Sequence, residues 1–343
     1  MNGRHSSRRD TFARDHPESF FLDPADAASL SAYLDRRHVL KSGELVRHVG
    51  KAGDGNMNCT LRIVTTERRL IVKQGRPWVE KYDHIDAPWG RTAVEGAFYN
   101  AVSRAPGVAT RMPALLDLDA GSQVLVLDDV GGADLTCLYA GATIGATAIA
   151  SLTAYLLALH AIDLDAAALL AFANRDMRAL NHEHMFRVPL REANGLDLDA
   201  ITPGLQALAD DVKHDARFGA RVESLGRHYL APGRQLVHGD FFPGSWLERD
   251  GEVFVIDPEF CVCRPAEFDV GVLLAHLIIS DQPTPQLELM RRAFDAGYDA
   301  TLVNGFAGVE IMRRLMGVAQ LPYFALVERK RELLERARQL VCE

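Results

Sequence analysis

The sequence has few cysteines and no excess of positive charge, and each feature argues against a broad class of protein. Its 343 residues include 38 Lys and Arg against 46 Asp and Glu, which gives a net charge of −8. Proteins that bind nucleic acid usually present a basic surface, so we expect no nucleic-acid partner. The five cysteines are odd in number and scattered, so they do not indicate a disulfide framework. Cys261 and Cys263 lie two positions apart, but no second pair or histidine cluster accompanies them, and they do not indicate a metal site.

Long hydrophobic runs are also absent. The most apolar stretch, residues 144–161, contains Ser151, Thr153, Tyr155 and His160, and it predicts a buried helix rather than a membrane span. The first 19 residues are polar and basic and lack the apolar segment of a secretory signal. We therefore expect a cytoplasmic protein with no membrane partner.

The N-terminal part of the chain predicts a small β-rich lobe. Residues 1–18 are polar, and we expect a disordered tail there. Asp23 and Pro24 then favour the start of a helix. Three apolar segments predict strands at about 45–50, 58–65 and 69–74. A helix is predicted at about 91–104, and two more strands flank the turn Asp119-Ala120-Gly121. We predict a five-stranded antiparallel sheet in an N-terminal nucleotide-binding lobe, residues 19–128.

The rest of the chain, residues 129–343, has the apolar periodicity of helices. We predict helices over about 146–160, 177–185, 202–228, 265–280, 284–301 and 304–342, the last broken near Leu321. The predicted fold class is α+β with two lobes, in which the larger C-terminal lobe is mainly helical and carries the catalytic and substrate residues.

Three carboxylates follow short strands in the second lobe and indicate phosphoryl transfer. Asp240 ends a His-Gly-Asp turn, and a predicted hairpin from Trp246 to Ile256 leads to Asp257 and Glu259. Side chains two residues apart on an extended segment share a face, so Asp257 and Glu259 can both face one Mg²⁺ ion. Asp240 is then the candidate catalytic base, which orients the acceptor hydroxyl.

Phosphoryl transfer also needs groups that hold the nucleotide phosphates, and the first lobe offers candidates. The glycine-rich segment from Gly50 to Asn58 links two predicted strands, although no Gly-Lys-Ser or Gly-Lys-Thr follows as in a Walker A loop. Lys73 ends the third strand, where a lysine can reach phosphates. Glu95 on the next helix can pair with Lys73 and fix its direction.

These residues, in this order, resemble those of the aminoglycoside phosphotransferase and choline kinase group, whose fold is similar to that of protein kinases. That group carries His-Gly-Asp followed by an asparagine five residues after the aspartate, where this chain has Ser245. The resemblance is more specific to the methylthioribose kinases, and it rests on several motifs: His-Gly-Asp-Phe-Phe-Pro-Gly-Ser, Asp-Pro-Glu-Phe from Asp257, the Gly53–Asn58 loop, Val72-Lys73-Gln74, Phe268-Asp269-Val270-Gly271 and Arg313-Arg314-Leu315-Met316-Gly317.

The resemblance implies a bilobal, protein-kinase-like enzyme that uses ATP and Mg²⁺. It implies nucleotide contacts from the loop, the lysine and the hinge: Gly53, Gly55, Asn56, Asn58, Lys73, Asp128 and Val130. It places Ser245 with Asp257 and Glu259 at the metal, and Glu259 would replace the missing asparagine. Asp269 would brace the His-Gly-Asp turn without touching the substrate.

The resemblance further implies a small-molecule acceptor, a hydroxyl of a methylthioribose-like sugar beside Asp240, Arg313 and Arg314. Consecutive residues on a helix point about 100° apart, so we expect at least one of the two arginines to be an ordinary surface or salt-bridge residue. Phe242 stands where these kinases tend to carry a histidine. This difference leaves the identity of the sugar undetermined.

Two other functions fit the same residues. One is phosphorylation of an aminoglycoside, another antibiotic or an amino alcohol, and the arginine pair argues against such cationic acceptors. The other is a non-catalytic nucleotide-binding protein of the same fold. Ser245 is consistent with this alternative, because it replaces the asparagine of the group. The sequence leaves the oligomeric state open as well, a homodimer included.

Overall fold

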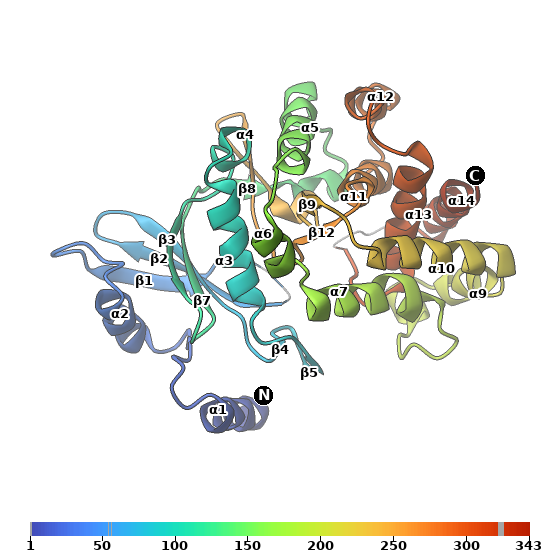
Figure 1. The fold of residues 1–343 in the computed structure, drawn as a ribbon. Coiled ribbons are helices and arrows are strands. Elements are labelled where there is room, and N and C mark those ends of the chain that lie inside the picture. The colour runs from blue at the N-terminus through green and yellow to red at the C-terminus, as the bar shows by residue number, and fades with distance from the viewer. Residues whose placement is uncertain (1, 54, 56, 322–325) are drawn as a thin grey trace. The chain divides into compact units, whose positions relative to one another are not determined.

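The structure is a computed structural model of the chain, and it describes residues 2–53, 55, 57–321 and 326–343. The chain forms two compact units (Figure 1). The first comprises Met1–Arg104 and Met112–Val130, and the second comprises Ala105–Arg111 and Gly131–Glu343. No described helix combines the length and the apolar character that a membrane span requires.

The first unit is built on an antiparallel sheet. Within the described residues this sheet has five strands in the order β1-β2-β3-β7-β6. Their bounds are β1 (Val46–Lys51), β2 (Cys59–Thr65), β3 (Arg69–Gln74), β6 (Leu115–Asp119) and β7 (Val124–Asp128). β3 lies in the centre and pairs Leu70 with Asp128 and Gln74 with Val124. The five-stranded sheet predicted from the sequence is confirmed.

Two helices and a short hairpin also belong to this unit. They are α2 (Ala27–Arg36), α3 (Arg91–Val102), β4 (Trp78–Val79) and β5 (Tyr82–Asp86). α2 begins later than Asp23 and Pro24 predict, because the Asp26 side chain caps it by accepting a hydrogen bond from Ser29 N. The hairpin lies between the predicted elements 69–74 and 91–104, in a segment for which no strand is predicted. α2 contributes Leu30, Tyr33 and Leu34 to a core shared with β2, β3 and β7.

The first residues of the chain differ from the expectation of a disordered tail, because they form helix α1 (Asn2–Asp15). Phe12 on this helix is 1% exposed. Its ring contacts Phe21, Trp78 and Trp89 at centroid distances of 5.1, 6.4 and 5.7 Å. A single apolar side chain in a polar stretch is a weak sequence signal, yet its burial among three aromatic rings ties the helix to the first unit.

The second unit is mainly helical. Its helices are α4 (Pro106–Ala109), α5 (Ala146–His160), α6 (Ala166–Ala171), α7 (Arg175–His182), α8 (Leu198–Ile201), α9 (Leu205–Lys213), α10 (Ala216–Leu230), α11 (Glu267–Ile279), α12 (Thr284–Ala293), α13 (Ala300–Met316) and α14 (Val327–Cys342). The 3-10 helices are η1 (Leu135–Ala140), η3 (Val188–Leu190) and η4 (Pro243–Ser245), and η2 (Glu183–Arg187) is a π-helix. α13 packs against both α11 and α14, and α11 and α13 are buried over most of their length.

Helix boundaries in this unit follow capping residues that the periodicity alone does not locate. The helix predicted over 202–228 is two helices, because the Asp215 side chain accepts a hydrogen bond from Phe218 N and starts α10. The helix predicted over 284–301 ends earlier, at Ala293. Asp299 then caps α13 through Thr301 N and Leu302 N.

Short strands position the segment with the three carboxylates. β9 (Gln235–Val237) pairs with β12 (Val262–Arg264), and β10 (Trp246–Arg249) pairs with β11 (Glu252–Val255) and β8 (Ala133–Asp134). Asp250 and Gly251 form the turn between β10 and β11, both at positive φ. The predicted hairpin is therefore present, and it delivers Asp257 and Glu259 just beyond β11.

Candidate active site

The His-Gly-Asp turn is held by Asp269 on α11. The carboxylate of Asp269 accepts hydrogen bonds from His238 N at 2.6 Å and Gly239 N at 2.9 Å. Gly239 has φ of +88°, and a Cβ atom there would lie 2.1 Å from Phe260 O, so no other residue fits. These two hydrogen bonds hold the backbone of the turn directly before Asp240.

Asp269 itself is fully buried and ionised. Burial opposes its ionisation, but the hydrogen bond from His160 and the backbone of Gly239 lower the pKa of this carboxyl below its ordinary value. His160 Nε2 lies 3.4 Å from Asp269 Oδ2, and His160 Nδ1 lies 3.0 Å from the hydroxyl of Tyr298. The bracing role that the resemblance implied for Asp269 matches this geometry.

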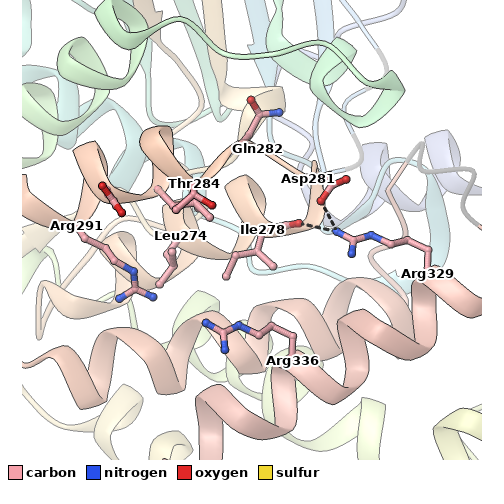
Figure 2. Close-up of a pocket in the computed structure, with 10 residues that line it drawn as sticks. Leu274, Ile278, Asp281, Gln282, Thr284, Arg291, Arg329 and Arg336 are labelled. Carbon is pink, nitrogen blue, oxygen red and sulfur yellow. Dashed lines mark hydrogen bonds and ion pairs between the residues drawn. The ribbon is translucent and has the colours of Figure 1, made fainter.

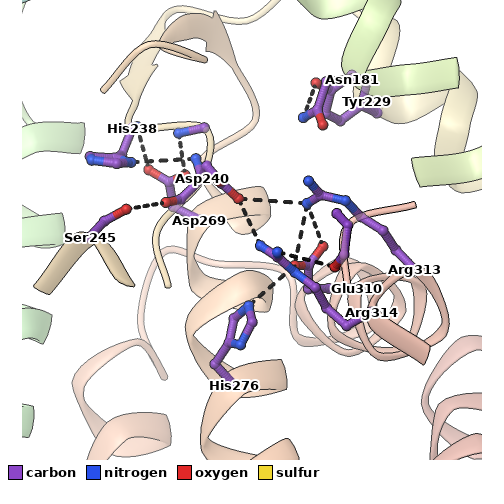
Figure 3. Close-up of polar contacts among 12 residues, drawn as sticks. Asn181, Tyr229, His238, Asp240, Ser245, Asp269, His276, Glu310, Arg313 and Arg314 are labelled. Carbon is purple, nitrogen blue, oxygen red and sulfur yellow. Dashed lines mark hydrogen bonds and ion pairs between the residues drawn. The ribbon is translucent and has the colours of Figure 1, made fainter. Parts of the chain in front are cut away.

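Both arginines of the predicted pair reach Asp240. Arg314 Nη2 lies 3.1 Å from Asp240 Oδ1, and Arg313 Nη1 lies 3.6 Å from the same oxygen (Figure 3). Their side chains are only 8% and 5% exposed, for Arg313 and Arg314, whereas that of Asp240 is 19% exposed. Neither arginine is therefore a surface residue; both are buried, and both form ion pairs with Asp240 and Glu310, in keeping with the salt-bridge alternative.

Glu310 explains why two consecutive arginines converge. It lies one turn earlier on α13 and is fully buried. Its Oε2 is 3.0 Å from Arg313 Nη1, and its Oε1 is 2.5 Å from Arg314 Nε. Residues three and four apart on a helix are neighbours, so one carboxylate can hold both guanidinium groups. Burial raises the pKa of Glu310, but Arg313 and Arg314 outweigh burial and hold the pKa well below its ordinary value.

His276 and Tyr139 continue this network behind the arginines. His276 Nε2 is 3.2 Å from Glu310 Oε1, and His276 Nδ1 is 2.7 Å from the Tyr139 hydroxyl. Burial lowers the pKa of His276, so the imidazole is neutral. With Glu310 ionised, we assign the proton to Nε2, which donates to Glu310, while Nδ1 accepts from Tyr139.

Phe242 covers the same network from the turn. Its ring lies 4.7 Å from the guanidinium carbon of Arg314 and 5.6 Å from the His276 ring. A guanidinium over an aromatic face is attracted by the ring. The residue that departs from the expected histidine therefore packs against the arginine pair.

The residues proposed for the metal lie in the same unit as Asp240. Asp257 follows β11 with φ of +67°, a left-handed conformation that an aspartate tolerates better than most residues. Glu259 is 6% exposed. The Ser245 hydroxyl donates to Asp240 O at 3.1 Å, so this side chain fastens the turn. The described residues do not gather three or more histidine, cysteine or acidic side chains into a metal-binding group.

Lys73 and Glu95 form a buried ion pair in the first unit. Lys73 Nζ lies 2.8 Å from Glu95 Oε2 and 3.0 Å from Oε1. Their side chains are 6% and 1% exposed. The pairing inferred from the sequence is present, and it connects the central strand β3 to α3.

The glycine-rich loop is anchored by an arginine that the sequence did not single out. Arg91 is buried, and it donates to Asn58 Oδ1 at 2.9 Å and to Met57 O at 3.0 Å. Gly53 has φ of +133°, and, apart from the chain neighbours of each glycine, no heavy atom of the described residues lies within 4 Å of a Cβ atom built at Gly53 or Gly55.

The remaining candidates for nucleotide contacts are Asn56, Asp128 and Val130. Asn56 lies outside the described residues. Asp128 ends β7 and donates its N–H to Ala114 O at 2.9 Å. Val130 is the last residue of the first unit.

Known proteins share this sequence pattern and this fold. The sequence matches the phosphotransferase enzyme family, APH, over residues 49–302. It is 27% identical to a methylthioribose kinase from Exiguobacterium sibiricum, with 83% of this chain and 84% of that protein covered.

The structure resembles that of LicA in complex with AMP, with a TM-score of 0.54 at 12% identity and coverage of 91% of this chain and 97% of LicA. It also resembles the ternary complex of streptomycin, ATP and APH(2")-IIa, with a TM-score of 0.53 at 13% identity and coverage of 86% and 90%. These likenesses confirm the predicted α+β kinase-like fold. Because the family match extends over most of the sequence, the chain belongs to the phosphotransferase enzyme family.

Proposed function

We propose that the chain is an ATP- and Mg²⁺-dependent small-molecule kinase that phosphorylates a hydroxyl of a methylthioribose-like sugar. The observation that carries this proposal is the setting of Asp240. Its backbone is fixed by Asp269, and its carboxylate meets two buried arginines. A carboxylate in a fixed position can orient an acceptor hydroxyl and accept its proton. We propose the cytoplasm as the compartment, where ATP is supplied and cysteine thiols stay reduced.

Nucleotide binding is proposed for the first unit. Lys73 is suited to contact the phosphates, because its ion pair with Glu95 fixes the ammonium group on the central strand. The open space at Gly53 and Gly55 lets backbone N–H groups approach an anion. The structural relatives captured with AMP or ATP support ATP as the phosphoryl donor. Asn56, Asn58, Asp128 and Val130 complete the proposed nucleotide contacts.

The donor set beyond β11 fits Mg²⁺. Mg²⁺ is usually held by one or two carboxylates together with substrate phosphates and water, so Asp257 and Glu259 suffice without a larger cluster. When bound, Mg²⁺ would neutralise charge on the phosphates. Ser245 fits less well as a direct ligand, because its hydroxyl already donates to Asp240 O. We retain Ser245 as a neighbour that keeps Asp240 in place.

The arginine pair favours a neutral acceptor over a cationic one. Two guanidinium groups next to Asp240 offset the attraction of that carboxylate for an ammonium group, whereas their N–H donors suit sugar oxygens. Glu310 and Asp240 balance the two positive charges, so this cluster provides no net negative charge for an aminoglycoside or choline. The curated relative named methylthioribose kinase supports the sugar proposed here.

A panel of acceptors tests this function. Wild-type chain is incubated with ATP, Mg²⁺ and one acceptor at a time, and ADP release is measured for methylthioribose, ribose, streptomycin and choline. We expect saturable turnover with methylthioribose that Asp240→Asn reduces by about 10²- to 10⁴-fold. Faster turnover of streptomycin or choline would overturn the sugar assignment. ATP binding without ADP release from any acceptor would instead indicate a non-catalytic nucleotide-binding protein.

A further inference from the structure

A cavity of about 340 Å³ opens in the second unit among residues outside the candidate active site (Figure 2). Its apolar wall consists of Leu274 and Ile278 from α11 and Leu287 from α12. The volume is within the range of small-molecule sites. The polar lining comes from α12, α14 and the turn between α11 and α12, and it is rich in arginine.

The two acidic residues of the lining each have an arginine partner. Asp281 Oδ1 accepts a hydrogen bond from Arg329 Nη2 at 3.0 Å. Glu288 Oε2 lies 3.5 Å from Arg292 Nη2, and Arg292 does not line the cavity. Both acidic side chains of the lining are therefore paired with arginines. The lining contains two further arginines that take no part in these ion pairs.

Those two guanidinium groups, of Arg291 and Arg336, are hydrogen-bonded to neutral amides. Both Nη atoms of Arg291 donate to Asn304 Oδ1 at 3.2 Å, and Arg336 Nη1 donates to Gln339 Oε1 at 3.1 Å. Among the ion pairs of the described residues, neither has a carboxylate partner within 4.0 Å. Burial and the charge of Arg336 lower the pKa of Arg291, and the charge of Asp295 opposes them without reversing the direction. Figure 2 shows the two guanidinium groups turned toward each other.

We propose that this cavity binds a small organic anion, a carboxylate or phosphate ester that carries a short apolar tail. Two like charges beside one cavity are relieved by an anion placed between them. The planar guanidinium of arginine matches carboxylate and phosphate groups with paired hydrogen bonds. Leu274, Ile278 and Leu287 offer the surface against which an apolar tail is removed from water.

Calorimetric titration tests this site with simple probes. Butyl phosphate and butyrate supply the two head groups on one tail, and butylamine supplies the same tail with the opposite charge. We expect one or both anions to bind the wild-type chain and butylamine to give no signal. The anion with the lower dissociation constant identifies the preferred head group.

Variants then locate the binding. Arg336→Gln removes one exposed guanidinium, and Arg291→Gln removes the half-buried one. Each change should raise the dissociation constant of the bound anion about tenfold, the effect of one charge-assisted hydrogen bond. Arg331→Gln is the matched control, an exposed arginine on the same helix outside the cavity lining. Absence of anion binding, or binding equal in wild type and Arg336→Gln, would overturn the proposal. Because turnover is not measured, this result is independent of the kinase assay.

Discussion

Glu310→Gln is expected to destabilise the second unit strongly, because Glu310 is the buried counter-charge of two arginines. The substitution keeps the shape of the side chain and removes its charge. Glu310 is fully buried, and the side chains of Arg313 and Arg314 are 8% and 5% exposed. Removing one partner from a buried ion pair costs about 3–5 kcal/mol. Since glutamine still accepts a hydrogen bond, we expect a loss near the lower limit, about 3 kcal/mol.

Urea unfolding followed by circular dichroism measures this loss. The control is Glu223→Gln, because Glu223 pairs with Arg227 at a similar distance of 3.0 Å but both side chains are mostly exposed. Exposed pairs contribute about 0.2–1 kcal/mol, so the control should change little. A loss below about 1 kcal/mol for Glu310→Gln, or one equal to the control, would refute the reasoning.

The pH dependence of this difference has a defined sign. The pKa of Glu310 is held well below 4.5 in the folded chain. A depressed carboxyl pKa stabilises the fold above the unfolded pKa, and this contribution is lost as pH falls toward the folded pKa. The gap in stability between wild type and Glu310→Gln should therefore be full at pH 7 and shrink below about pH 4.5. A constant gap down to pH 3 would contradict the assigned charge.

Three further changes test other parts of the account. Gly239→Ala should cost at least about 1–3 kcal/mol of stability, since φ is +88° and the new Cβ would meet Phe260 O; an unchanged melting temperature would contradict this. Lys73→Met should lower kcat/KM for ATP by roughly 10²-fold with the circular dichroism spectrum preserved, and unchanged kinetics would exclude a phosphate contact. Burial lowers the pKa of His276, so the folded chain takes up fewer protons than the unfolded chain, and stability should fall from pH 7.5 to 5.5. His276→Gln should reduce that slope, by at most about 1.4 kcal/mol per pH unit, and an identical slope would contradict the neutral assignment.

The features that the sequence predicted well depend on short stretches of chain. Alternating apolar residues and turn residues were enough to predict the sheet and the hairpin before Asp257. The order of motifs along the chain was enough to identify the family and to predict the pairing of Lys73 with Glu95. In each case the relevant residues lie in one strand, one turn or one recurring motif.

The features that the sequence did not predict depend on contacts between distant segments. Helical spacing alone separates Arg313 from Arg314 by about 100°. The buried carboxylate of Glu310 holds both guanidinium groups, and both also reach Asp240 from a distant segment. Glutamate at that position could have been noticed, because residues three and four apart on a helix are neighbours. The contact of His160 with Asp269 and the burial of Phe12 have no comparable local signal, because their partners lie far away in the chain.

The most direct test of the central claim is detection of the phosphorylated product. Methylthioribose, ATP and Mg²⁺ are incubated with wild-type chain or Asp240→Asn, and the sugar is examined by mass spectrometry and ³¹P NMR. We expect wild type to form a phosphorylated methylthioribose, and we expect Asp240→Asn to form at least about 10²-fold less of it. Product formed equally by both proteins would contradict the role of Asp240, and no product with wild type would contradict the proposed substrate.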